Sequence, residues 1–116
     1  MPMIIVTSND LPGYRVDRVI GAVYGVAVRS RSFIGNALGN LRAAFGGSQL
    51  GYAKMVAESR DEALGLLAEE AERLGANAIL AMRFDSGEFD AGRQQSMNEV
   101  TAYGTAVVVS RTGAPG

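Results

Sequence analysis

Apolar residues between positions 52 and 74 recur at the spacing of an α-helix. Successive members lie three, four or seven residues apart, which places them on one stripe of a 3.6-residue spiral: Tyr52, Val56, Ala63, Leu67, Ala71 and Leu74. Acidic residues occupy the opposite face: Glu58, Glu62, Glu69 and Glu72. The stretch has no proline and one glycine, Gly65, and Gly75 follows it as a left-handed stop. The pattern therefore predicts one long amphipathic helix over residues 52–74.

Four other segments are rich in β-branched and aromatic residues, which predicts strands at Met3–Val6, Tyr14–Arg29, Ala76–Asp85 and Glu99–Arg111. In the long second segment both alternating sets of residues are apolar or small, which is typical of a sheet covered on both faces. We expect one set to share a face: Val16, Ile20, Ala22, Tyr24, Val26 and Val28. The other face then carries Val19, Gly21, Val23, Gly25 and Ala27.

Two segments have less regular patterns. Ser30–Leu50 has helical spacing interrupted by Gly35 and Gly39, each of which costs about 1 kcal/mol relative to alanine in a helix, so it predicts a short, weak helix. Ser86–Asn98 is polar and contains glycine, so it predicts a hairpin loop. The order of elements predicts a single α+β domain over residues 1–116, with a mostly antiparallel sheet packed on one long helix and the short one.

Since one long helix covers one face only, a second copy of the chain is the simplest cover for the other face, and we expect a homo-oligomer.

Composition adds few constraints on function. The 116 residues are 47% hydrophobic and 20% charged, which suits one domain with one core. No apolar run approaches the roughly 20 residues of a membrane span, and the first ten residues lack the pattern of a signal peptide, so we expect a cytoplasmic protein with no membrane partner. The net charge of −1 does not favour nucleic acid as a partner.

The chain contains neither histidine nor cysteine. Ser-His-Asp and Cys-His catalysis and a conventional structural zinc site are therefore excluded within one chain. Neither of the common glycine-rich phosphate-binding motifs is present. We predict a protein that is not an enzyme and needs no cofactor.

Two groups of residues are candidates for a functional site. Around the predicted hairpin loop, carboxylates suit a hard divalent cation such as magnesium or calcium, although their spacing fits no calcium loop and a plain polar loop is the alternative: Asp85, Glu88, Asp90 and Glu99. A ligand-binding surface is predicted where the segment before the long helix joins it, with stabilising packing of the helix entry as the alternative: Gly46, Gly47, Tyr52 and Arg60.

Several local strings resemble the YbjQ-like family, small bacterial and archaeal proteins labelled as heavy-metal-binding. They are Gly46-Gly47 with Tyr52, residues 58–63 (ESRDEA), residues 74–79 (LGANAI) leading into 83–85 (RFD), and residues 102–107 (AYGTAV). The resemblance covers nearly the whole chain. It implies a two-layer β-α-β-β fold similar to the dodecin subunit, assembled as a ring, most often a pentamer.

The metal label of the family fits this chain poorly, because a thiophilic metal prefers thiolate or imidazole ligands. The leading hypothesis is a ring-forming, non-enzymatic protein that binds a small ligand or a partner protein at subunit interfaces. The alternative is a protein that binds a divalent metal through the carboxylates named above. A third hypothesis is an enzyme whose site spans an interface and uses Arg60, Tyr52 and a carboxylate.

Overall fold

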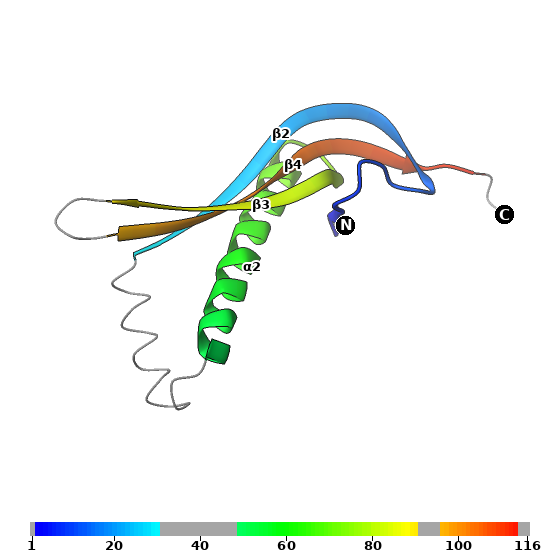
Figure 1. Ribbon diagram of the computed structural model, residues 1–116. Helices are drawn as coiled ribbons and strands as arrows, with labels where there is room; N and C mark the ends of the chain where they lie inside the picture. The colour runs from blue at the N-terminus through cyan, green and yellow to red at the C-terminus, as the bar shows by residue number, and fades with distance from the viewer. Residues whose placement is uncertain (1, 31–48, 91–95, 114–116) are drawn as a thin grey trace.

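The computed structural model describes residues 2–30, 49–90 and 96–113, which form an open sheet with one helix on one face (Figure 1). The elements are β1 (Ile4–Ile5), β2 (Tyr14–Ser30), α2 (Gln49–Arg73), β3 (Ala78–Asp90) and β4 (Ser96–Arg111). The strand order is β1-β3-β4-β2. The two long pairings are antiparallel, and the short β1 runs parallel to β3. The predicted α+β class and the mostly antiparallel sheet are confirmed.

The ends of the elements differ from the sequence prediction mainly around the hairpin. The prediction of a polar loop over Ser86–Asn98 is wrong at both ends, because Gly87 pairs with Glu99 and Glu88 with Asn98 in a continuous ladder. Ladder hydrogen bonds join backbone groups, so polar side chains extend a strand once its neighbour is in register. Most of the weak helix predicted within Ser30–Leu50 lies outside the described residues.

The core lies between α2 and the sheet. On the helix it consists of Ala63, Leu67 and Ala71, each of which is 0% exposed, as the predicted stripe requires. The facing strand residues are Val23, Ala27, Ile79, Ala102 and Ala106. The helix packs mainly on β2 and β4 and touches β3 much less.

Gly25 of β2 marks the closest approach of the helix to the sheet. A Cβ added there would overlap the carbonyl oxygen of Ala63 and the backbone nitrogen of Leu67, and would lie 2.9 Å from the backbone carbon of Leu66. Helix backbone therefore rests directly on strand backbone, which only glycine permits. This contact fixes where α2 crosses the sheet.

Register shifts change which side chains face the helix. Along β2 they fall between Val16 and Arg18 and between Val19 and Gly21, and each inserts one residue relative to β4. The predicted assignment of residues to the two faces of the sheet is correct for residues 22–28. It is wrong at Val19 and Ile20, because Ile20 packs against the core and Val19 is 63% exposed. One inserted residue reverses a period-two pattern, and the bulge itself is invisible in that pattern.

A third shift lies in β3 between Leu80 and Arg83, where Ala81 has φ 55°. Before it, Ala78 and Leu80 face away from α2; after it, Phe84 packs toward the helix core. The bulge therefore turns the even-numbered residues of the β3 end, Ser86 and Glu88 included, to the helix side.

The face of the sheet opposite α2 is only partly covered. At one end Ala78, Leu80, Val107 and Val109 are buried, under a cover from the N-terminal part of the chain: Ile4, Val6, Leu11 and Tyr14. Elsewhere this face exposes apolar and aromatic side chains, with Tyr24 65% and Tyr103 42% exposed and paired directly across the β2–β4 ladder. The sequence predicts that this face needs a further cover, and the chain supplies it at one end.

The described residues contain no helix that is both long and apolar enough to cross a membrane. The molecule is elongated, with extents of 57 × 32 × 21 Å and a radius of gyration of 18.0 Å. A compact domain of this length has a radius of gyration of about 13 Å. The described part of the chain is therefore thin, with one helix packed on one sheet.

We expect Gly25→Ala to lower the free energy of unfolding by about 1–3 kcal/mol, because the new methyl group forces the helix away from the sheet. The matched control is Gly65→Ala on exposed α2, where an added Cβ meets no heavy atom within 4 Å. That change should raise stability by about 1 kcal/mol through helix propensity alone. Urea unfolding at one protein concentration measures both; equal stability of Gly25→Ala and the wild type would contradict the close contact.

Candidate functional site

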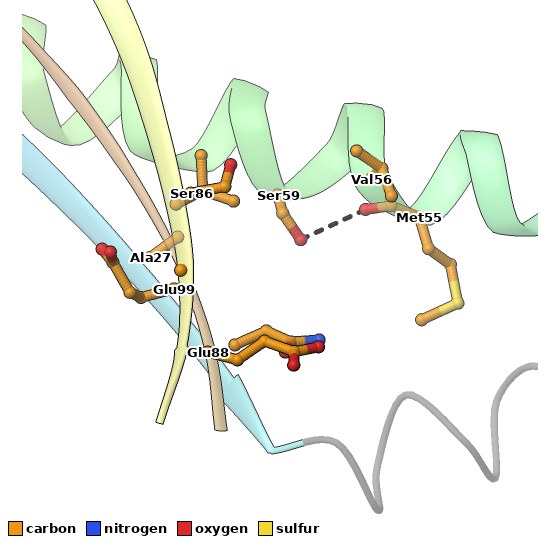
Figure 2. A pocket seen from close by; sticks show the side chains of 10 residues that line it. Ala27, Met55, Val56, Ser59, Ser86, Glu88 and Glu99 are labelled. Carbon is orange, nitrogen blue, oxygen red and sulfur yellow. Dashed lines mark hydrogen bonds between the residues drawn. The ribbon is translucent and has the colours of Figure 1, made fainter. Parts of the chain in front are cut away.

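A cavity of about 300 Å³ lies between the first half of α2 and the hairpin end of the sheet (Figure 2). Its helix wall is formed by Met55, Val56 and Ser59. The sheet wall comes from three strands: Ala27 of β2, Ser86, Gly87 and Glu88 of β3, and Asn98, Glu99 and Val100 of β4. Among the described residues α2 packs mainly on β2 and β4 and less on β3, and the cavity lies where its first half faces the hairpin end of the sheet.

Ser59 is the one buried polar residue among the described positions, at 8% exposed. Its hydroxyl donates to the carbonyl oxygen of Met55 at 3.1 Å, one turn earlier in the helix (Figure 2). This bond satisfies the hydroxyl group inside an otherwise apolar stripe. Ser59 therefore places an oxygen in the helix wall without breaking α2.

Asn98 lines the cavity and carries an unusual polar atom. Its side-chain oxygen Oδ1 is buried and has no hydrogen-bond partner. A buried carbonyl oxygen without a partner costs about 1–3 kcal/mol, so native proteins contain few of them. Asn77 shows the ordinary arrangement, since its amide donates to Val109 O at 2.9 Å and its Oδ1 accepts from Val109 N at 2.8 Å.

The four predicted metal-binding carboxylates are not brought together. Glu88 and Glu99 extend to opposite sides of the strands, as alternation in the ladder requires (Figure 2). Glu99 accepts a 2.6 Å hydrogen bond from the Thr101 hydroxyl, and Asp85 is exposed. The side chain of Asp90 lies outside the described part. Among the residues that the structure describes, no three His, Cys, Asp or Glu side chains are placed to hold a metal ion.

The residues predicted to form a ligand-binding surface are only partly described. Gly46, Gly47 and the side chain of Tyr52 lie outside the described residues. Arg60 lies on α2 with its guanidinium carbon 5.5 Å from the centre of the Phe84 ring, a cation–π arrangement. It lines a second groove between α2 and β3 rather than the cavity.

Sequence reasoning missed the residues that give the cavity its polarity. Ser59 carried a signal, because it interrupts the apolar stripe between Val56 and Ala63. Asn98 carried one as well, since it alternates with Val100 and Ala102 toward the core. Its assignment to a loop concealed this position.

Fold and cavity together define a small α+β domain whose described residues form one helix on an open sheet, with most of the polar side chains of the cavity in its sheet wall. The crystal structure of a protein of unknown function of the DUF74 family from Pediococcus pentosaceus has this fold, with a TM-score of 0.62 and 17% identity, covering 93% of this chain and 98% of that one. At this identity the likeness establishes the fold alone.

The chain belongs to the YbjQ family, whose model, described as "Putative heavy-metal-binding", matches residues 3–110. It is 58% identical over 107 residues to a UPF0145 protein of Acidiphilium cryptum, covering 92% of this chain and 94% of that one. It is 46% identical over 109 residues to a UPF0145 protein of Acidothermus cellulolyticus, covering 94% and 97%. The family resemblance seen in the sequence is confirmed, whereas its likeness to the dodecin subunit stays a prediction.

We expect Asn98→Leu to raise the free energy of unfolding by about 1 kcal/mol, because it removes a buried acceptor that has no partner. The control is Asn77→Leu, which breaks two hydrogen bonds to Val109 and should lower stability by about 2 kcal/mol. Chemical unfolding of both variants measures the difference. Equal losses of stability would mean that the Asn98 side chain is satisfied like that of Asn77.

Proposed function

We propose that the protein is a non-catalytic binding protein that assembles into a ring of identical subunits and holds a small ligand in the cavity beside α2. The observation that carries the assembly is the long edge strand β2. Its residues 19–28 include no charged side chain, and its outer face exposes Val19 at 63%, Tyr24 at 65% and Val28 at 49%. Edge strands of soluble proteins are normally shortened, charged or covered, because an open apolar edge invites pairing with another chain.

The two edges of the sheet favour a ring over a symmetric dimer. Within the described residues β2 pairs only with β4, and β3 beyond Met82 also pairs only with β4. These two edges lie on opposite sides of the sheet. Addition of β2 of one copy to β3 of the next is a head-to-tail contact, which closes into a ring when the rotation permits. The pentamer implied by the family resemblance is the ring size that we expect.

The cavity connects ligand binding to this assembly. Ser86, Gly87 and Glu88 of its wall belong to the β3 end that would receive the neighbouring strand. A ligand in the cavity would therefore sit beside a subunit boundary. The absence of histidine and cysteine from the sequence supports binding over catalysis.

The metal alternative receives less support from the described residues. Strand alternation separates Glu88 from Glu99, and neither meets two further carboxylates. A hard cation needs several oxygen ligands around one point. We therefore place the small ligand ahead of a metal ion.

Val26→Lys tests the assembly. Val26 is 44% exposed on the outer face of β2, so a charge there should disrupt pairing at the edge without unfolding the subunit. We expect native mass spectrometry to show a ring for the wild type and smaller species for the variant, with circular dichroism unchanged.

The matched control is Leu66→Lys on α2, where a side chain of the same class is 39% exposed. It should leave the subunit number unchanged. Val28→Lys provides a second edge variant in case Val26→Lys fails to fold. A monomeric wild type, or a ring unaffected by both edge charges, would contradict the proposed assembly.

A further inference from the structure

A groove between α2 and β3 combines an apolar floor with one positive and one negative side chain. Its volume of about 590 Å³ lies within the range of small-molecule sites. Apart from two charged residues, Arg60 and Asp61, the described lining is apolar: Ala53, Val56, Ala57, Leu64 and Phe84. Of these residues only Val56 also lines the cavity. The groove therefore suits a ligand that has a charged head and an apolar body.

Helix geometry explains how these side chains come together. Arg60 and Asp61 are consecutive in α2, so they point about 100° apart and do not face each other. Ala57 lies one turn before them and Leu64 one turn after them, between the two charges on the helix surface. The two charges therefore flank an apolar strip of α2.

The side chain of Arg60 is positioned without being neutralised. Its guanidinium carbon lies 5.5 Å from the centre of the Phe84 ring. Among the described residues it forms neither a hydrogen bond nor an ion pair. A cation–π contact leaves the N–H donors of a guanidinium able to bind a carboxylate through two parallel hydrogen bonds. Arg60 can therefore hold a carboxylate at the β3 side of the groove.

Asp61 restricts which carboxylates suit the groove. It is exposed, and within the described part of the chain it also forms no hydrogen bond or ion pair. Its charge repels a ligand that carries a carboxylate alone and attracts an ammonium group. A ligand with both charges on neighbouring atoms gives each of the two side chains a partner.

We propose that the groove binds an α-amino acid with an apolar side chain, its carboxylate held by Arg60 and its ammonium group near Asp61. The side chain of the ligand lies against Ala53, Val56 and Ala57, where the two alanines leave room for a branched aliphatic group. This inference goes beyond the proposed function, because it concerns a second site within one subunit.

The test is a ligand-observed NMR titration, by saturation transfer, of the full chain with L-leucine at neutral pH. Three comparators each lack one part of L-leucine: isocaproate lacks the ammonium group, isoamylamine lacks the carboxylate, and L-alanine lacks most of the side chain. We expect saturable binding of L-leucine and severalfold weaker binding of each comparator. No binding of L-leucine, or equal binding of any comparator, would overturn the inference.

Three variants locate the site. Arg60→Gln, which removes the charge and the paired donors, should weaken binding of L-leucine about tenfold. Asp61→Asn should weaken it severalfold and should tighten binding of isocaproate, because the repulsion of a lone carboxylate is removed. Arg73→Gln, in the last turn of α2 and outside the groove, is the matched control and should leave binding unchanged.

Two results from these variants would overturn the assignment. One is undiminished binding of L-leucine to Arg60→Gln, and the other is an equal loss in Arg73→Gln. Circular dichroism of each variant should match that of the wild type, since Arg60, Asp61 and Arg73 are all exposed.

Val26→Lys separates this inference from the proposed assembly. Val26 lies on the face of the sheet opposite α2, so L-leucine should still bind when the charge disrupts the ring. A ring that binds no L-leucine refutes the amino-acid site and leaves the assembly intact. Loss of binding together with the ring would overturn the placement of the site within one subunit.

Discussion

The contact between α2 and Gly25 determines most of what is distinctive about this fold. Because the helix backbone rests on the strand backbone at that point, α2 is held over β2 and β4 and only its second half reaches a closed core. Ala63, Leu67 and Ala71 are fully buried, whereas Val56, nearer the start of the helix, remains partly exposed. The same contact therefore creates the core at one end and the cavity at the other.

The bulges decide which side chains meet in that cavity. The shift at Ala81 turns Ser86 and Glu88 to the helix side, opposite the orientation of Ala78 and Leu80 in the same strand. Without it, the odd-numbered residues of β3 would face the helix in place of Ser86 and Glu88. The bulge thus determines which side chains line the cavity wall, while the regular part of the sheet forms the core that stabilises the fold. The Asn98 Oδ1 atom, buried without a hydrogen-bond partner, is a local departure from good packing.

The sequence predicted the regular features and not the irregular ones. The stripe from Ala63 to Ala71 and the alternation of residues 22–28 follow directly from helical and strand periodicity, and the structure has both. The bulges beside Ile20 and Ala81 left no mark in composition, and polarity concealed the strand ends at Glu88 and Asn98. Convergence of side chains from α2, β3 and β4 depends on crossing position and register, which no local pattern encodes. Carboxylates that are close in sequence were consequently predicted to converge, although alternation places Glu88 and Glu99 on opposite faces.

We propose that one subunit is not the complete folded unit, because in the described residues β2 forms an open edge and the sheet face opposite α2 is only partly covered. Hydrogen exchange of the β2 amides between Ala22 and Val28 tests it most directly. Among the described residues of one subunit, alternate amides of this stretch have no strand on the side away from β4. Protection of both alternating sets in the native protein is the result that the account predicts, because a neighbouring copy supplies the missing carbonyl groups. Rapid exchange of the outward set beside slow exchange of the inward set would contradict it.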